Sequence, residues 1–171
     1  PLPAVLGHEG AGIVERVGNR VRKVRPGDRV VMTFASCGAC TNCLEAAPAY
    51  CAGTQTLWYS GGRPDGTPTL RNAEVPVHGA FFQQSSFATH ALATERNVVK
   101  VAEDLPLELL GPLGCGVQTG AGAVVHSLRL GTGASFAVFG AAGVGLSAVM
   151  AARICGAGPI IAVDTRPERL A

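Results

Sequence analysis

The spacing of apolar residues divides the chain into two parts with different patterns. Over residues 1–35, AGIVERVG alternates between apolar and polar positions, and a Pro-Gly-Asp turn precedes the β-type run RVVM. Residues 52–79 are rich in Gly, Pro, Thr and Asn, which predicts a long loop. Residues 80–101 return to strand-like patterns in FFQQSSFATHAL and NVVKV. We therefore expect a mainly-β first part.

A different pattern begins near Cys115. The stretch PLELLGPLGCGVQTGAGAVVHSL favours helices interrupted by glycines. SFAVFG then has the pattern of an apolar strand, AAGVGLSAVMAARICGA that of a helix, and PIIAVD that of a second strand. Strand, helix and strand in this order predict a βαβ unit with parallel strands. The expected fold class is therefore α/β joined to mainly-β.

Composition narrows the function classes. Of the 171 residues, 47% are hydrophobic and 15% are charged, so the chain can bury a core. A net charge of +2 with no Lys/Arg run gives no reason to expect nucleic acid or an anionic membrane as partner. The long apolar stretch after Val124 is interrupted by His126, Arg129 and several glycines, so it does not predict a membrane span. No signal peptide is visible, although the chain begins at Pro1. Both ends look cut, and we expect a piece of a longer protein.

Four of the six cysteines cluster in one lobe, residues 36–52, with the spacing C-x2-C-x2-C-x7-C. Four thiolates satisfy a tetrahedral Zn²⁺, and a set without histidine leaves no open coordination position. The spacing therefore predicts a structural zinc site that stabilises a lobe too small for its own core. Its four ligands would be Cys37, Cys40, Cys43 and Cys51.

Two alternatives to zinc stay open. Bacterial ferredoxins also use C-x2-C-x2-C, but their fourth cysteine follows after three residues and precedes a proline, whereas here the gap is seven and Ala52 follows. Two disulfides are the other alternative, although a secreted disulfide framework is usually spread along a smaller and less apolar chain. Reduced thiols favour a cytoplasmic protein.

The pattern G-x-x-G-x-G occurs three times, so it is weak by itself. Only residues 140–145, GAAGVG, follow a predicted strand, precede a predicted helix and have an acid about 20 residues further on, Asp164. The other two copies are Gly7/Gly10/Gly12 and Gly111/Gly114/Gly116.

The third copy has the properties of a dinucleotide site. Gly140 permits the tight turn, while Gly143 and Gly145 let the backbone approach the pyrophosphate at the helix N-terminus. Asp164 can accept a hydrogen bond from a ribose hydroxyl, and its charge would repel a 2′-phosphate, which favours NAD over NADP. The nearby positive charges of Arg166 and Arg169 weaken this preference. The alternative is a glycine cluster that only serves packing.

GHEGAG places His8 and Glu9 among three glycines, which leave the imidazole unobstructed. By itself, His8 fits a turn or core histidine better than a metal ligand. Taken alone, Cys115 and Cys155 each fit a buried apolar cysteine.

Read in order, GHEGAG, the four-cysteine lobe, GCG and GAAGVG resemble the zinc-dependent medium-chain alcohol dehydrogenases over the whole chain. FFQQSSFATHAL and LGPLGCGVQTGAGA look most like the aryl (benzyl) alcohol dehydrogenases. The resemblance implies a GroES-like catalytic domain over residues 1–115 and the start of a Rossmann NAD-binding domain over residues 116–171, both incomplete.

The resemblance also implies residue roles. His8 and Cys115 match ligands of a catalytic zinc, and Glu9 matches an acid beside that metal. Thr119 and Val144 match positions beside the nicotinamide, and Arg169 matches a basic residue near the adenine ribose. The implied cofactor-binding set is Thr119, Gly140, Gly143, Val144, Gly145, Asp164 and Arg169.

The activity implied is NAD-dependent oxidation of a primary, aromatic alcohol to the aldehyde by hydride transfer in the full-length protein. Zinc acts as a Lewis acid on the bound alcohol, and this piece alone should be inactive. The partners implied are a small alcohol or aldehyde and further copies of the chain in a dimer or tetramer. A glutathione-dependent formaldehyde dehydrogenase and a non-catalytic zinc-stabilised module are the alternatives.

The remaining ring residues give weaker expectations. His78, His90 and His126 show no partner pattern and should lie at the surface or in loops. Trp58 and Tyr59 could line a substrate channel, but packing within the loop is the simpler expectation.

Overall fold

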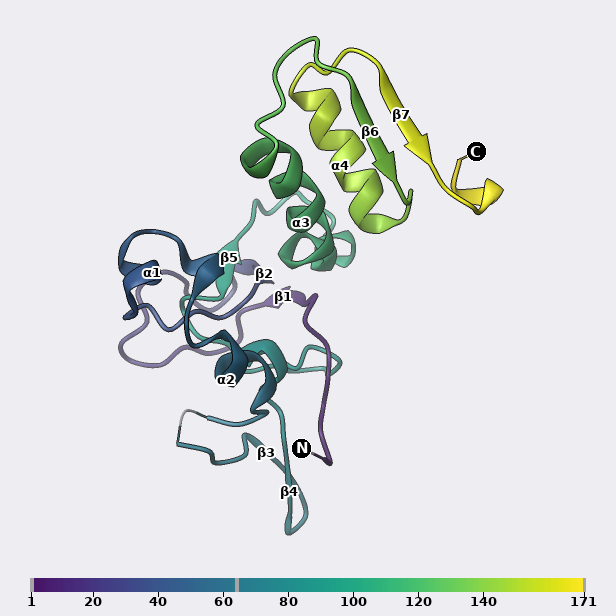
Figure 1. Ribbon diagram of the computed structural model, residues 1–171. Coiled ribbons are helices and arrows are strands. Elements are labelled where there is room, and N and C mark those ends of the chain that lie inside the picture. Colours follow the sequence, from purple (N-terminus) through teal and green to yellow (C-terminus); the bar gives the residue numbers. More distant parts are fainter. Residues whose placement is uncertain (1, 64, 171) are drawn as a thin grey trace. The chain divides into compact units, whose positions relative to one another are not determined.

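The computed structural model describes residues 2–63 and 65–170 (Figure 1). The chain folds into two compact units, Pro1–Gly114 and Cys115–Ala171, here called the first and second unit. The first is mainly β and the second is α/β, so the fold class predicted from the sequence is confirmed. Each unit has its own cluster of buried apolar side chains.

The first unit is built on an antiparallel sheet with the strand order β1-β2-β5. Its strands are β1 (Ala11–Ile13), β2 (Arg29–Met32) and β5 (Val98–Lys100). Because β2 is the central strand, Val30, Val31 and Met32 are all buried. Val30, Met32 and Val98 form the core of the sheet, against which Val14 and Val24 pack.

An ion pair between Asp28 and Lys100 connects the turn before β2 with strand β5. The carboxylate of Asp28, whose side chain is only 8% exposed, accepts a hydrogen bond of 2.6 Å from Lys100 Nζ and one of 3.0 Å from the backbone N–H of Arg25. The bond from Lys100 is the main cause that lowers the pKa of Asp28, followed by the bond from Arg25.

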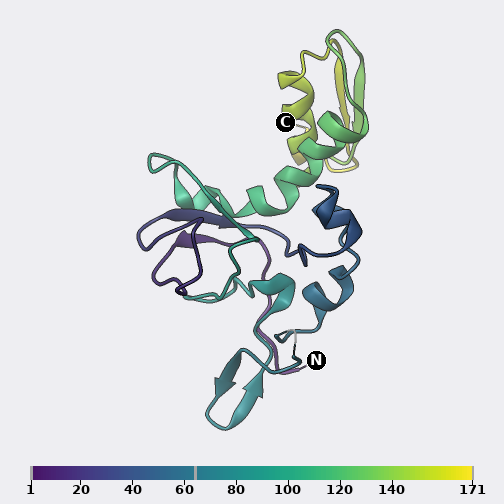
Figure 2. The ribbon, with the colours of Figure 1, turned by 90° about the vertical axis from the view of Figure 1, so that its left-hand side faces the viewer.

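The cysteine lobe and the segment after it carry short elements. They are α1 (Thr41–Leu44), a 3₁₀ helix (Pro48–Tyr50), α2 (Thr54–Tyr59), β3 (Leu70–Asn72) and β4 (Val75–Val77). The prediction of one long loop over residues 52–79 is therefore wrong in part. The hairpin of β3 and β4, seen from the side in Figure 2, turns at Ala73, which has a φ of 50°.

The strand predicted in FFQQSSFATHAL is also wrong. Residues Phe81–Gln83 form a 3₁₀ turn, and strand β5 begins only at Val98 within the predicted NVVKV strand. Phe82, Gln83 and Ser85 have φ values of 51°, 56° and 45°, in the left-handed region that side chains other than glycine rarely adopt. A backbone with these angles cannot continue a β ladder, whatever the apolar pattern of the sequence.

The second unit contains the predicted βαβ element. Strands β6 (Phe136–Phe139) and β7 (Ile160–Val163) pair in parallel, with Phe136 opposite Ile160, and α4 (Gly143–Ile154) connects them. Helix α3 (Gly116–Gly122) and a π-helical turn (Ala123–Ser127) precede β6. A 3₁₀ helix (Pro167–Arg169) follows β7. The core consists of Val124, Phe136, Ala148, Ala151 and Ala152.

The stretch before Cys115 forms two short 3₁₀ helices, Leu107–Leu109 and Gly111–Gly114, as expected for helices broken by glycines, but the glycines after Cys115 do not interrupt α3. Gly116, Gly120 and Gly122 all lie within α3. A Cβ on Gly120 would stand 2.2 Å from the carbonyl oxygen of Val144, so glycine lets α3 pack closely on α4. Cys155 follows the last residue of α4 and is half-buried against the apolar core.

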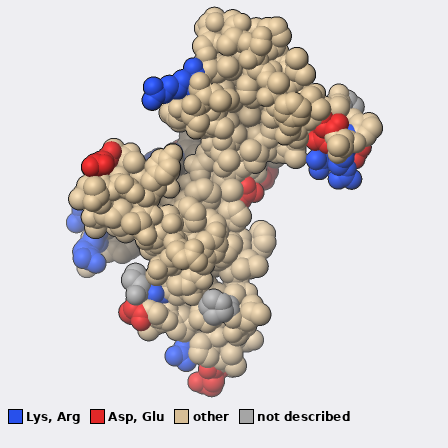
Figure 3. Space-filling model, viewed as in Figure 1, with Lys and Arg blue, Asp and Glu red and all other residues tan. Residues whose placement is uncertain are grey.

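The charged side chains are few and of both signs. On the face shown in Figure 3, they lie in small separate groups. One mixed group, near the end of the second unit, pairs Arg166 with Glu168 at 2.9 Å and Arg169 with Asp164 at 3.3 Å. Over the described residues, every helix is too short or too polar to cross a membrane.

Candidate functional site

The turn that carries His8 has glycines at positions 7 and 10 because backbone of Phe87 and side chains of other segments pass very close to it. A Cβ on Gly7, whose φ is +97°, would lie 2.5 Å from the backbone nitrogen of Phe87. A Cβ on Gly10 would lie 2.2 Å from Cε of Met32. The carbonyl of Gly10 also accepts a hydrogen bond of 2.8 Å from Met32 N–H, which fixes the turn against β2.

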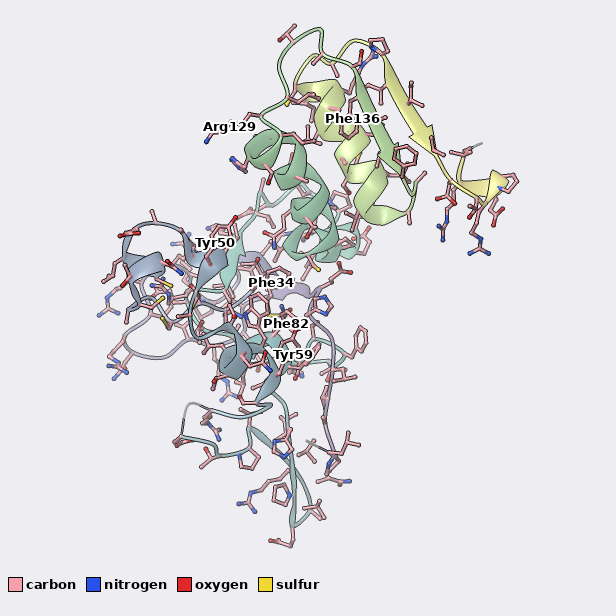
Figure 4. All side chains as sticks on the ribbon, viewed as in Figure 1. Phe34, Tyr50, Tyr59, Phe82, Arg129 and Phe136 are labelled. Carbon is pink, nitrogen blue, oxygen red and sulfur yellow. The ribbon has the colours of Figure 1, made fainter. Side chains whose placement is uncertain are left out.

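Aromatic rings from two segments surround the imidazole of His8. Phe82 stacks on it at 4.7 Å between centroids and 25° between planes. Phe81 meets it edge-on at 5.9 Å, and Phe34 lies at 6.3 Å. We call these rings, with Trp58 and Tyr59, the aromatic cluster. Figure 4 shows Phe34, Phe82 and Tyr59 gathered beside α2.

Trp58 is a packed member of this cluster. Its ring stacks on Phe82 at 5.0 Å and 17°, and its indole N–H donates to the carbonyl of Ala35 at 2.9 Å. These contacts favour the packing interpretation of Trp58 over a loosely held channel residue.

The four cysteine sulfurs of the lobe converge. Cys37, Cys40, Cys43 and Cys51 each offer one Sγ, and these atoms lie within 4.8 Å of one another. The sulfurs of Cys37 and Cys43 are 3.9 Å apart, far beyond a disulfide bond, and all four are free thiols. Tetrahedral Zn–S bonds of about 2.3 Å place sulfurs roughly 3.8 Å apart, so the donor set fits a zinc ion.

Backbone N–H groups stabilise the thiolate form in the lobe. Ala39 and Cys40 donate to Cys37 Sγ at 3.4 and 3.3 Å, and these bonds lower the pKa of Cys37 to about 6. Burial raises the pKa of Cys43 to about 11. Cys51 Sγ accepts from Cys37 N–H at 3.2 Å and Gly53 N–H at 3.3 Å. Sulfurs that accept such bonds are suited to hold a cation.

The segment that leads into Cys115 packs against the His8 turn and β2. A Cβ on Gly111 would lie 2.4 Å from the carbonyl oxygen of Glu9, and a Cβ on Gly114 only 1.8 Å from that of Met32. The carbonyl of Gly114 accepts a hydrogen bond of 3.2 Å from Thr33 Oγ1. The second G-x-x-G-x-G pattern therefore serves close backbone packing within the first unit.

The glycine turn of the second unit has the conformation expected for residues 140–145. Gly140 has a φ of +99° at the end of β6. A Cβ on Gly145 would lie 1.8 Å from the carbonyl oxygen of Gly140, so a side chain there collides with backbone. Gly143 has open space around it, which leaves room for a ligand to approach the first residue of α4.

Asp164 lies beside this turn. Its side chain is 4% exposed, and its carboxylate accepts from Ala141 N–H at 2.7 Å, Arg166 N–H at 2.9 Å and Arg169 Nη1 at 3.3 Å. The bond from Arg166 N–H, followed by that from Ala141 N–H, lowers the pKa of Asp164. The acid is therefore ionised at neutral pH, next to the glycine turn.

A family model described as "Alcohol dehydrogenase GroES-like domain" matches residues 1–103 of the chain. The chain belongs to this alcohol dehydrogenase family. The resemblance drawn from GHEGAG and the cysteine lobe is thereby confirmed.

Relatives within the alcohol dehydrogenase family match nearly the whole chain. A protein named geraniol dehydrogenase, from Castellaniella defragrans, is 55% identical over 172 residues, covering 100% of this chain and 46% of the relative. A crystal structure titled alcohol dehydrogenase zinc-binding domain protein, from Burkholderia ambifaria, has a TM-score of 0.97 and 58% identity, covering 99% of this chain and 46% of that one. The benzyl alcohol dehydrogenase of Acinetobacter calcoaceticus has a TM-score of 0.90 and 51% identity, with the same coverage. The chain thus spans about half the length of these alcohol dehydrogenases.

The structure brings some of the predicted site residues together. The four cysteines converge, and the glycine turn lies beside Asp164, which pairs with Arg169. His8 and Glu9 belong to the first unit and Cys115 to the second, so the shared catalytic metal remains a prediction. Thr119 and Val144 are exposed in the second unit, where Thr119 Oγ1 donates to the carbonyl of Cys115 at 2.8 Å.

Sequence reasoning missed the residues that fix His8. Gln84 and Asn97 are fully buried polar residues, and Phe82 stacks on the imidazole. One signal was available: a run of two glutamines and two serines within an apolar segment does not fit a simple half-buried strand.

Proposed function

We propose that the whole protein oxidises a primary alcohol to the aldehyde with zinc and NAD, and that its substrates carry an unsaturated carbon next to the carbinol carbon. The observation that carries this proposal is the setting of His8 among Phe34, Phe81 and Phe82. An imidazole ligand with a wall of aromatic rings suits an apolar, π-rich alcohol.

The residues divide between two metal sites. Cys37, Cys40, Cys43 and Cys51 would hold a structural zinc, while His8 and Cys115 would hold the catalytic one, with Glu9 beside it. When bound, that zinc would supply a Lewis acid that lowers the pKa of the alcohol hydroxyl, and NAD would accept the hydride. The packing of Gly111 against the Glu9 carbonyl supports this grouping, since residues 111–114 run along the His8 turn directly before Cys115.

Phe34, Phe81 and Tyr59, which are not fully buried, would hold the organic part of the substrate, while the packed Trp58 and the buried Phe82 support them. These three rings would exclude water and bind a flat ring or an alkene through dispersion, so the carbinol carbon would be oriented without hydrogen bonds to the rest of the alcohol. This wall is poorly suited to a glutathione adduct, whose carboxylates need cationic partners.

The glycine turn and Asp164 would hold the cofactor. Open space at Gly143 admits a pyrophosphate to the N-terminus of α4, and the ionised Asp164 would accept a ribose hydroxyl. Arg169 already pairs with Asp164, so its charge is partly neutralised and offers less attraction to a 2′-phosphate. These features favour NAD over NADP. Thr119 and Val144 would flank the nicotinamide.

The names of two relatives agree with the substrate class. Geraniol dehydrogenase and benzyl alcohol dehydrogenase are named for an allylic and a benzylic alcohol, and both alcohols have an sp² carbon next to the carbinol carbon. These names support such alcohols as the proposed substrates of the whole protein.

The test is an activity panel on the whole protein. It compares benzyl alcohol, geraniol, ethanol and S-hydroxymethylglutathione, each with NAD and NADP. We expect kcat/KM for benzyl alcohol or geraniol to exceed that for ethanol by at least about 100-fold with NAD, because each buried CH₂ equivalent contributes about 0.8 kcal/mol. Equal rates with ethanol, or a preference for the glutathione adduct, would contradict the substrate class. A complete lack of turnover, together with bound structural zinc, would favour the non-catalytic module.

A further inference from the structure

Both polar atoms of the Gln84 side-chain amide form hydrogen bonds with backbone groups in and near the turn that carries His8. The side chain is 0% exposed. Its Nε2 donates to the carbonyl of His8 at 3.0 Å and, more weakly, to that of Thr33 at 3.4 Å. Its Oε1 accepts from the N–H of Gly10 at 3.3 Å. One buried amide therefore bonds the two residues that flank Glu9, namely His8 and Gly10. The same amide also connects this turn to Thr33, the residue after β2.

A buried amide at this place needs a reason. Taking an amide out of water costs free energy unless its hydrogen bonds are replaced, whereas an apolar side chain of the same size has no such cost. The bonds of Gln84 reach residues 51 to 76 positions away in the sequence, so they do not serve its own turn. What they fix is the position of His8 and Gly10.

The same segment also holds the imidazole. Phe82, two residues before Gln84, stacks on the His8 ring at 4.7 Å and 25°. Stacking restricts rotation of the imidazole, and the bond from Gln84 restricts movement of the peptide that carries it. Residues 82–84 thus hold both the ring and the backbone of His8.

This segment keeps a strained backbone. Phe82, Gln83 and Ser85 have φ values between 45° and 56°, and the strain persists because hydrogen bonds hold each end of the segment. Ser85 Oγ donates to the carbonyl of Val5 at 2.6 Å, and the buried Asn97 donates to that of Gln83 at 3.1 Å. Strained segments that the surrounding structure holds so firmly are characteristic of functional sites.

We propose that Gln84 is a positioning residue for His8, which it sets for metal binding before the metal arrives. The inference rests on the proposed function, in which His8 is a ligand of the catalytic zinc. Because the ring is already placed, metal binding does not have to order it, and the site binds its metal more tightly.

The test uses the whole protein and the variant Gln84→Met. Methionine fills a similar volume with a flexible apolar chain but offers no amide. We expect the catalytic metal, identified as the one that His8→Ala removes, to be released to a chelator about 10- to 100-fold faster, as when other residues that orient metal ligands are replaced. The structural metal should be released at the wild-type rate. With Co²⁺ at the catalytic site, the visible absorption bands should shift.

Gln83→Met is the matched control. Gln83 lies in the same strained segment, and its amide donates to the carbonyls of Leu57 at 3.0 Å and Gly62 at 3.3 Å, away from His8. Gln83→Met therefore loses two amide hydrogen bonds, against three in Gln84→Met, and should lower thermal stability without changing release of the catalytic metal. If Gln83→Met speeds that release as much as Gln84→Met, Gln84 has only a structural role.

A second variant and a second measurement keep the test decisive. If Gln84→Met does not fold, Gln84→Asn replaces it, since its amide is one methylene too short to reach the His8 carbonyl and the Gly10 N–H together; release at the wild-type rate would then overturn the proposal. In metal-free protein with ¹³C-labelled histidine, we expect the His8 ring signal to be shifted upfield by the stacked Phe82 ring and to move toward its random-coil position in the variant. The ring signal does not depend on catalysis, and the two failures can therefore be told apart. If the wild-type protein binds no metal beyond the structural ion, the proposed function is refuted. If the His8 ring signal is the same in the variant and the wild type, the role of Gln84 is refuted.

Discussion

Gly143 and Gly145 lie two residues apart, but an added side chain would have open space at Gly143 and would collide with backbone at Gly145. For Gly145→Ala, the new Cβ would lie 1.8 Å from the Gly140 carbonyl oxygen, so the turn or α4 must shift. We expect a loss of stability of about 2–3 kcal/mol, the upper range for overpacking. Urea unfolding of the whole protein measures it.

The control for this prediction is Gly143→Ala, which adds a methyl group where no atom lies within 4 Å. Its stability should stay within about 0.5 kcal/mol of the parent, while NAD affinity falls because the methyl group occupies the space proposed for the pyrophosphate. If both variants unfold at the same urea concentration, the close packing at Gly145 is not what holds the turn.

Individual residues could be predicted from the sequence where their partners are near. The four cysteines lie within fifteen positions, so their spacing alone indicated a common site. The partners of Gln84 are more than fifty positions away, and no local pattern marks them. Its role could be found only from the structure.

Among the elements, β2 and β5 are joined through the ion pair of Asp28 and Lys100. Since the pKa of Asp28 is lower in the folded protein than in the unfolded chain, its contribution is fully present above the unfolded pKa of about 3.9 and is lost as the pH falls through the folded pKa. We expect acidification from pH 7 to pH 3 to destabilise the parent more than Asp28→Asn. Urea midpoints of both proteins at several pH values test this.

The comparison with Asp28→Asn separates this pair from other acids, because every other carboxylate remains in both proteins. Parallel loss of stability in the two proteins across this range would show that the pair contributes nothing that depends on pH.

Secondary-structure elements were predicted well where the periodicity of apolar residues determines the conformation of the backbone. The βαβ unit was predicted correctly because two apolar strands flank a helix with a glycine turn between them. The strand expected in FFQQSSFATHAL was wrong because left-handed φ values at Phe82, Gln83 and Ser85 depend on buried bonds to distant backbone. Hydrophobic pattern carries no information about such bonds.

At the scale of the whole molecule, we expect the 171-residue chain to bind the structural zinc without showing alcohol turnover. The 171-residue chain contains all four lobe cysteines but spans only 46% of the length of two dehydrogenase relatives. We expect this chain to bind about one zinc ion and to show no oxidation of benzyl alcohol with NAD. Elemental analysis and an absorbance assay at the NADH band measure the two properties.

Cys43→Ser is the control for the zinc count, since it removes one thiolate and should release most of the metal at neutral pH. Zinc content unchanged in that variant would place the ion elsewhere. Turnover by the 171-residue chain would show that the residues present already complete the site.

The different sequence distances in the two predicted metal sites have a consequence for biosynthesis. All four lobe cysteines leave the ribosome within a few seconds of one another, whereas the bond from Gln84 to His8 closes a span of 76 residues. The nascent chain can therefore capture zinc in its lobe before the imidazole has been set in place. Metal acquisition would then proceed in a fixed order, with the structural ion loaded first.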